Sequence, residues 1–182
     1  MRILSISGSL RAGSYNTALA RAAAELAPVG VDVELFDGLR ELPLFDADLE
    51  AAGLDAVERL RNRIGAADAV LFVTPEYNGS IPGVLKNAVD WASRPRDGAA
   101  LRGKAVAVAG ASPGQYGAIW AQQDLRRVLG VAGARVIAGD LPVSRAHEAF
   151  EKSGVLRSPL VAERLRNHLV ALVHEATPAL AA

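Results

Sequence analysis

Cysteine is absent from this 182-residue sequence, and histidine is scarce. The lack of cysteine excludes disulfides, thiolate metal sites and thiol nucleophiles. The three histidines, His147, His168 and His174, fit no metal-ligand spacing, so we expect them on the surface or on helix faces and expect no metal site. An excess of one charge is also missing, because 20 Lys and Arg balance 20 Asp and Glu. This balance argues against nucleic acid or an anionic membrane as the main partner.

Long apolar runs are missing as well. No run reaches the length of a membrane span, and the first apolar segment, residues 2–6, is too short for the core of a secretory signal peptide. We therefore expect a cytoplasmic protein. Neither a repeat nor a low-complexity linker divides the sequence, and a domain of this length buries roughly 70% of its unfolded surface. The sequence predicts a single domain over residues 1–182.

Strand-like and helix-like segments alternate along the chain. The predicted strands cover residues 2–6, 31–36, 69–74, 105–109 and 135–138. The predicted helices cover residues 16–26, 54–66, 83–92, 115–129 and 159–176. Short Val-rich strands suit a parallel sheet that is buried on both faces, and the alternation implies right-handed crossovers. We predict an α/β fold, a flavodoxin-like three-layer sandwich with a five-stranded parallel sheet in the order 2-1-3-4-5. Residues 37–55 read as a long surface excursion.

The loop after the first predicted strand, GSLRAGSYNT at residues 8–17, is rich in hydroxyl and amide groups. Its cation is Arg11, and its hydroxyl and amide side chains are Ser9, Ser14, Asn16 and Thr17. Free N–H groups at the start of a helix bind anions, and Arg11 adds a positive charge. The loop has neither the Gly-Lys-Ser/Thr of a P-loop nor the spacing G-x-G-x-x-G, and a hydroxyl-rich loop of this kind holds the phosphate of FMN in flavodoxin-like domains. The alternative is an ordinary helix cap beside a solvated arginine.

Two further loops follow the third and fourth predicted strands. TPEYNGSIPG at residues 74–83 has Glu76, Tyr77 and Asn78 between two prolines that stiffen its ends. GASPGQYG at residues 110–117 is rich in glycine, which permits close backbone approach. In the predicted sheet order, all three loops meet at one edge and can surround one ligand. The alternative is that both segments are ordinary turns between strands and helices.

Two sequence blocks, GSLRAGSYNTALAR and TPEYNGSIPGVLKNAVDWASRP, resemble the NADPH-dependent FMN reductase family, the flavodoxin-like quinone, azo-dye and chromate reductases. The resemblance implies that the FMN phosphate is held by Ser9, Arg11, Ser14, Asn16 and Thr17. It implies that the ribityl chain and the isoalloxazine ring are lined by Pro75, Glu76, Tyr77 and Asn78, and that Ser112 and Gly114 lie beside the pyrimidine end of the ring. Many members have a double glycine in the third loop, where this chain has Gly-Gln-Tyr-Gly at residues 114–117.

The implied activity is transfer of electrons from NAD(P)H through bound FMN to quinones, flavins, azo compounds or metal oxyanions such as chromate. We expect no catalytic side chain, since the flavin carries the chemistry, and we expect Glu76 to fix its loop rather than to act as a general base. NADPH is the expected cosubstrate, with NADH as a substitute, because Arg11 and Arg94 can attract its 2′-phosphate.

Family members are homodimers or homotetramers, so we expect a homodimer or a homotetramer. The apolar positions of residues 83–92 outnumber those needed for one sheet-facing stripe, which makes Trp91 an interface candidate. The alternative is that Trp91 belongs to the core, and Trp120 is a second interface candidate. Arg94 and Arg126 resemble positions that make polar contacts between subunits.

Two alternative functions stay open from the sequence. A flavodoxin-like electron carrier would bind FMN without turning over NAD(P)H, although Arg11 and the zero net charge favour the enzyme. A binding module without flavin would purify colourless.

Overall fold

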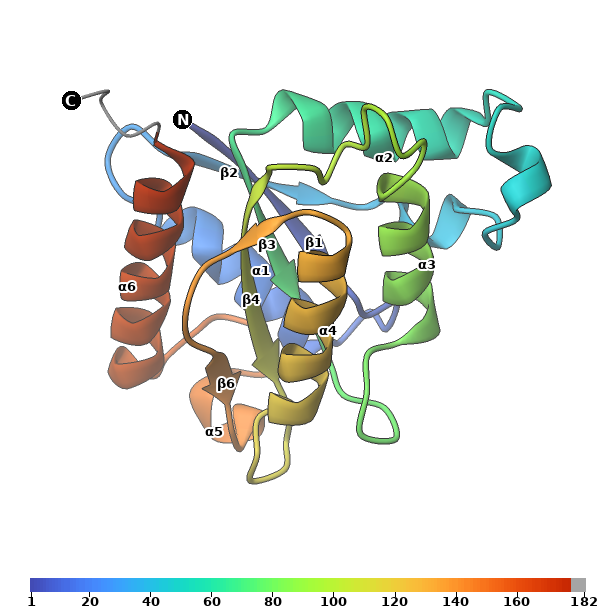
Figure 1. Ribbon diagram of the computed structural model, residues 1–182. Helices are drawn as coiled ribbons and strands as arrows, with labels where there is room; N and C mark the ends of the chain where they lie inside the picture. The colour runs from blue at the N-terminus through green and yellow to red at the C-terminus, as the bar shows by residue number, and fades with distance from the viewer. Residues whose placement is uncertain (178–182) are drawn as a thin grey trace.

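The computed structural model describes residues 1–177. Its strands are β1 (Arg2–Ser7), β2 (Asp32–Phe36), β3 (Ala69–Val73), β4 (Ala105–Ala111), β5 (Arg135–Val136) and β6 (Leu141–Val143). Its α-helices are α1 (Tyr15–Glu25), α2 (Asp55–Ala66), α3 (Gly83–Ala92), α4 (Ile119–Val131), α5 (Ala146–Ala149) and α6 (Pro159–Ala176), with two 3₁₀ turns, η1 (Gly38–Glu41) and η2 (Ala47–Leu49). The strands form a parallel sheet in the order β2-β1-β3-β4-β5, and β6 also pairs with β4 (Figure 1). The predicted fold and sheet order are confirmed.

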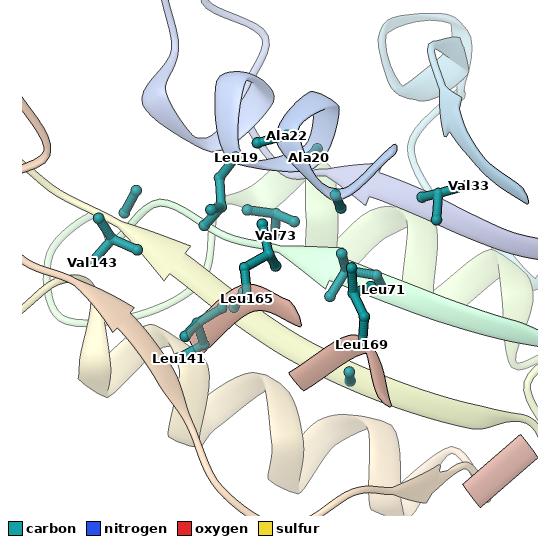
Figure 2. Close-up of a cluster of buried hydrophobic side chains, with 14 of the residues drawn as sticks. Leu19, Ala20, Ala22, Val33, Leu71, Val73, Leu141, Val143, Leu165 and Leu169 are labelled. Carbon is teal, nitrogen blue, oxygen red and sulfur yellow. The ribbon is translucent and has the colours of Figure 1, made fainter. Parts of the chain in front are cut away.

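Side chains alternate between the two faces of the sheet. In β3, Leu71 and Val73 belong to the core beneath α1 and α6, whereas Val70 and Phe72 belong to the core beneath α2, α3 and α4. Figure 2 shows Leu71 and Val73 beside Leu19 of α1 and the leucines of α6. Because both faces of the sheet are covered, polar groups of the strands gather at the strand ends, where the loops emerge.

Alanine sets the packing of one face. The residues of β4 that face α1 and α6 are Ala105, Ala107, Ala109 and Ala111, and those of α1 that face the sheet include Ala18, Ala22 and Ala23. Small side chains on both partners let the helix lie close to the strands, and alanine is the strongest helix former. This close packing fixes the start of α1 relative to the end of β4.

The last strand is interrupted, a feature that the sequence did not predict. β5 and β6 both pair with β4, and the segment between them is held by Arg126. Its Nη1 donates to the carbonyl oxygens of Ile137 at 2.6 Å and Gly139 at 2.9 Å, and its Nε lies 3.4 Å from Oδ1 of Asp140. The guanidinium of Arg126 is thus engaged within the chain, and its expected contact with a second subunit stays a prediction.

The start of α4 also differs from the prediction. The helix begins at Ile119 and not at Gln115, since Gly117 and Ala118 have φ angles of 59° and 62° that no right-handed helix contains. A Cβ on Gly117 would lie 2.8 Å from the backbone nitrogen of Val143, so the turn packs tightly against β6. The short helix α5 was likewise not predicted.

The segment 37–55 is only partly a surface excursion. Leu39 and Leu42 are buried, and the indole Nε1 of Trp91 donates to the carbonyl oxygen of Pro43 at 2.8 Å. Trp91 is fully buried, and its ring lies 4.9 Å from that of Phe45. The expectation that Trp91 faces a second subunit is therefore wrong: it fastens this segment to α3.

Within residues 1–177, no helix is long and apolar enough to cross a membrane. In the same range, no group of three or more His, Asp or Glu side chains is arranged to hold a metal ion.

His168 on α6 is the buried histidine. Its side chain is 9% exposed, and Nε2 lies 3.0 Å from the carbonyl oxygen of Val108. Burial is the main cause that lowers the pKa of His168 below its ordinary value of 6.5, and the carbonyl opposes it.

The shift predicts a pH dependence of stability. Because the folded state binds this proton less readily than the unfolded state, the free energy of unfolding should fall as the pH drops below about 6.5 and level off below the lowered pKa of the folded state. His168→Gln, which keeps an N–H donor, should show a smaller loss between pH 7.5 and pH 5. Urea unfolding of both proteins at the two pH values is the measurement, and equal losses would contradict the assignment.

Candidate functional site

The carboxyl ends of β1, β3 and β4 open into three loops that meet at one edge of the sheet. They enclose a cleft of about 110 Å³. The cleft is lined by Ser9, Arg11, Ser14, Tyr15, Asn16, Pro75, Glu76, Tyr77, Ala111, Ser112 and Pro113. Ligand pockets usually measure about 300–1,000 Å³, so this cleft suits one part of a larger ligand. The rest of such a ligand would lie outside the cleft, over the carboxyl edge of the sheet.

The first loop presents an anion site at the start of α1. Ser14 is the N-cap, and its Oγ accepts from the backbone N–H groups of Asn16 and Thr17. Within residues 1–177, the N–H groups of Gly13 and Tyr15 have no protein acceptor. A Cβ built on Gly13 would lie 3.7 Å from Nη1 of Arg11, which shows that the guanidinium lies over this loop. Free N–H groups and a cation therefore converge where the helix dipole is positive.

Asn16 and Thr17 have contacts that sequence reasoning did not foresee. The Nδ2 of Asn16 donates to the carbonyl oxygen of Ala111 at 2.9 Å, and its Oδ1 accepts from the N–H of Ala111 at 2.8 Å. Asn16 is 3% exposed. The Oγ1 of Thr17 lies 2.9 Å from Oγ of Ser7. These side chains therefore join the first loop to β4 and β1.

The second loop is a tight hairpin. The backbones of Tyr77 and Ser80 exchange two hydrogen bonds, at 3.0 and 3.1 Å. The two residues between them, Asn78 and Gly79, have φ angles of 53° and 76°. Such a turn favours Asn-Gly, since both central residues must adopt positive φ. The turn presents Tyr77, which is 52% exposed, beside the cleft.

Two side chains clamp this hairpin onto α4. The Oε2 of Glu76 accepts from the N–H groups of Trp120 at 3.0 Å and Ala121 at 3.2 Å, so Glu76 caps the helix. The hydroxyl of Ser80 donates to Oδ2 of Asp124 at 2.6 Å, and this bond is the main cause that lowers the pKa of Asp124. The loop-fixing role expected for Glu76 matches this geometry.

The third loop is held by its own polar groups. The Oγ of Ser112 accepts from the N–H of Gly114 at 3.1 Å, and the carbonyl oxygen of Gly114 accepts from the N–H of Arg145 at 2.9 Å. Gly110 at the base of the loop is required by close packing, because a Cβ there would lie 2.8 Å from the carbonyl oxygen of Thr74.

Eight of the eleven residues predicted for the site line the cleft. Thr17, Asn78 and Gly114 lie in the same loops, beside the lining. The prediction missed Tyr15, Ala111 and Pro113, each of which is a chain neighbour of a predicted residue. The sequence indicated the three loops but could not tell which of their side chains line the cleft.

Arg94 lies away from this cleft. It follows the end of α3, and this helix of ten residues is about 15 Å long and begins beside the second loop. Arg94 and Arg11 of one chain therefore do not act side by side on the 2′-phosphate of NADPH.

Exposed aromatic rings stand near the mouth of the cleft. Tyr116 and Trp120 are 53% and 47% exposed, and their rings lie 4.8 Å apart. The backbone of Trp120 is bonded to Glu76, which lines the cleft. Half-exposed rings at a site are suited to contact with flat ligands.

Comparisons with known proteins agree with this geometry. Residues 1–148 match the family described as NADPH-dependent FMN reductase. An NAD(P)H-dependent FMN reductase of Pseudomonas aeruginosa is 44% identical over 174 residues, which cover 94% of this chain and 93% of that protein. A quinone reductase of Escherichia coli is 41% identical over 139 residues, which cover 75% of this chain and 73% of that protein. The solved structure of FerB, a flavoenzyme NAD(P)H:(acceptor) oxidoreductase from Paracoccus denitrificans, is 35% identical and superimposes with a TM-score of 0.85 over 96% of both chains.

The cap made by Glu76 can be tested by removal. Glu76→Ala should lower the free energy of unfolding of the apoprotein by about 1 kcal/mol, because two N–H groups of α4 lose their acceptor. Glu76→Gln keeps an oxygen acceptor and should retain most of that stability. Urea unfolding measures both, with Glu163→Ala on the exposed side of α6 as the control. If Glu76→Ala unfolds like the control variant, the cap contributes nothing.

Proposed function

Because the chain belongs to the NADPH-dependent FMN reductase family, we propose that it is an FMN-containing NAD(P)H oxidoreductase that reduces quinones. The observation that carries the proposal is the convergence of three loops and a helix N-terminus on one cleft at the carboxyl edge of the sheet. When bound, FMN supplies the redox chemistry, accepting hydride from NAD(P)H and passing electrons to the acceptor.

The phosphate of FMN belongs at the start of α1. Ser9, Arg11 and Ser14 line the cleft there, beside the free N–H groups of Gly13 and Tyr15. This donor set suits a dianion, since charged donors and backbone N–H groups act together. Asn16 and Thr17 contribute by holding the loop, because their side chains are bonded to Ala111 and Ser7.

The flat end of the flavin belongs between the second and third loops. Pro75, Glu76 and Tyr77 form its wall on one side, with Asn78 beside them in the same loop, and Ser112 lies on the other side with Gly114 next in its loop. The hairpin is rigid because its turn is doubly hydrogen-bonded and clamped to α4. A rigid wall lets the protein orient the ring without moving any proton itself.

Small-molecule acceptors and the nicotinamide reach the ring from the open side. Quinones are the proposed acceptors, because relatives 41–44% identical include quinone reductases and an NAD(P)H-dependent FMN reductase. NADPH is the proposed cosubstrate, with NADH as a substitute. The same relatives favour the enzyme over an electron carrier, since the flavodoxin of Pseudomonas aeruginosa, at 19% identity, shares the fold alone.

A homodimer in the cytoplasm is the proposed working state. Exposed apolar and aromatic side chains on α4, Trp120 and Val131, support contact with a second copy. Trp120 and Val131 replace Trp91 as candidates for the subunit interface, because Trp91 is fully buried in the core of its own chain.

Turnover with purified protein tests the function. The protein should purify yellow, oxidise NADPH in the presence of 1,4-benzoquinone, and give parallel double-reciprocal plots when both substrates are varied, because the two substrates react in turn at one flavin. If the protein binds FMN but neither NADPH nor NADH bleaches the flavin under anaerobic conditions, the protein is an electron carrier. A colourless protein that does not bind added FMN would contradict the proposal altogether.

Binding of FMN and riboflavin tests the phosphate site. Arg11→Ala should weaken FMN by roughly 10- to 100-fold, corresponding to about 1.5–3 kcal/mol for a charged contact, and should change riboflavin little. Flavin fluorescence titration of the apoprotein measures both. Arg166→Ala on α6 is the control for the lost charge. Equal weakening of both flavins would overturn the assignment of Arg11.

A further inference from the structure

A second hollow lies beside the flavin cleft, between the start of α1 and the segment that follows α5. Its volume is about 480 Å³, well above that of the cleft itself. Ser14 and Tyr15 line both spaces and form the wall between them. The opposite wall of this α1–α5 hollow comes from α5 and residues 150–154.

A short hairpin builds that opposite wall. Phe150 and Leu156 pair as an antiparallel bridge, and the N–H of Gly154 donates to the carbonyl oxygen of Glu151 at 2.9 Å. The hydrogen-bonded turn places Lys152 at the tip of the hairpin, and Lys152 is exposed. The ammonium group is therefore carried by an ordered turn that lines the hollow.

A second cation reaches the hollow from α1. A Cβ built on Gly154 would lie 3.7 Å from Cβ of Ala18, so the hairpin lies against this helix. Arg21 follows Ala18 by three residues and lies on the same face of α1, one turn further along. Arg21 and Lys152 thus line the same space from two separate elements.

These two cations are free to bind an anion. Within residues 1–177, neither Arg21 nor Lys152 is paired with a carboxylate. The carboxylate that lines the hollow, Glu151, accepts from the hydroxyl of Ser153 at 3.3 Å. A guanidinium group and an ammonium group that approach from two walls suit the oxygens of a phosphate monoester.

An aromatic surface adjoins the cations. Phe150 is buried, Tyr15 is half-buried, and their ring centroids lie 5.9 Å apart. Such a surface suits contact with a flat heteroaromatic base, and the volume lies within the range of small-molecule sites. The ligand matched to these walls is a nucleoside that carries a phosphate monoester.

The place of the hollow in the fold connects it to the cosubstrate. α1 follows β1 and α5 follows β6, so the hollow opens at the carboxyl edge of the sheet, where the flavin cleft also opens (Figure 1). NADPH differs from NADH by a phosphate monoester on the ribose of its adenosine half. The pyrophosphate separates this half from the nicotinamide, so its phosphate belongs beside the flavin cleft and not within it.

The proposed contact between subunits leaves this region open. Ala149 and Phe150 pack in the core beneath α1 and α6, whereas α4 packs on the other face of the sheet through Leu125 and Leu129. A dimer that forms through the exposed side chains of α4 therefore does not cover the hollow.

We propose that the α1–α5 hollow binds the adenosine 2′-phosphate of NADPH, with Arg21 and Lys152 as its phosphate ligands. The inference rests on the proposed NAD(P)H activity and names the residues that give it a preference for NADPH.

Calorimetric titration of the FMN-saturated protein tests the site without turnover. The probes are adenosine 2′,5′-bisphosphate and adenosine 5′-monophosphate, which differ by the 2′-phosphate alone. The bisphosphate should bind saturably and at least tenfold more tightly than the monophosphate, because the two cations contact the additional phosphate.

A double variant locates the binding. Arg21→Gln/Lys152→Gln should weaken the bisphosphate at least tenfold, whereas the matched pair Arg2→Gln/Arg102→Gln, at the amino edge of the sheet, should change it less than twofold. All four side chains are exposed, so thermal unfolding of both double variants should match that of the unaltered protein.

Steady-state kinetics supply the second measurement. Arg21→Gln/Lys152→Gln should raise the KM for NADPH about tenfold with little change in kcat, and should raise the KM for NADH far less, because NADH has no 2′-phosphate. The control pair should alter neither KM by more than twofold.

Three outcomes would overturn the proposal: a bisphosphate that binds no more tightly than the monophosphate, equal weakening by the two double variants, and an equal rise in the KM values for NADPH and NADH. Failure of the proposed activity gives a different result, a bound flavin that neither nucleotide reduces in the unaltered protein.

Discussion

The paired hydrogen bonds between Asn16 and Ala111 are the interaction on which the site depends. They connect the first turn of α1 to the last residue of β4, across the end of β3. Both atoms of the amide are used, and the group is buried, so removing either partner would leave a buried donor or acceptor without a partner. The bonds hold the first and third loops in register. The anion site of the first loop therefore has a fixed position relative to the third loop.

The second loop is fixed by a different means. Its hairpin is rigid in itself, but its position comes from Glu76 and Ser80, which bind the start and the first turns of α4. Since α4 packs on the sheet through Leu125 and Leu129, the hairpin is anchored to the core through the helix. A site between loops thus obtains the rigidity of the layers beneath it.

Periodicity predicted the layers but not the individual contacts. Val-rich segments with both faces apolar gave the sheet and its order, since few arrangements bury such strands. The break between β5 and β6 was not predicted, because it is stabilised by Arg126 from a distant helix. The site loops were predicted from glycine, proline and hydroxyl content. The roles of Asn16 and Trp91 were not, because each is decided by one partner far away in sequence, Ala111 and Pro43.

The composition of the chain does not predict how its charged residues are distributed over the surface. Acidic and basic residues are equal in number, yet five basic residues and one acidic residue, Asp90, line a hollow between α3 and α4. Three of the five are paired with carboxylates of the chain, Lys86 with Asp90, Arg94 with Glu50 and Arg127 with Asp124. The helix dipole does not account for these cations, because neither α3 nor α4 carries a basic residue in its last turn. The dipole of one helix does not require the cations of two helices to face a common space. That juxtaposition follows from the parallel crossovers, which place the ends of successive helices side by side.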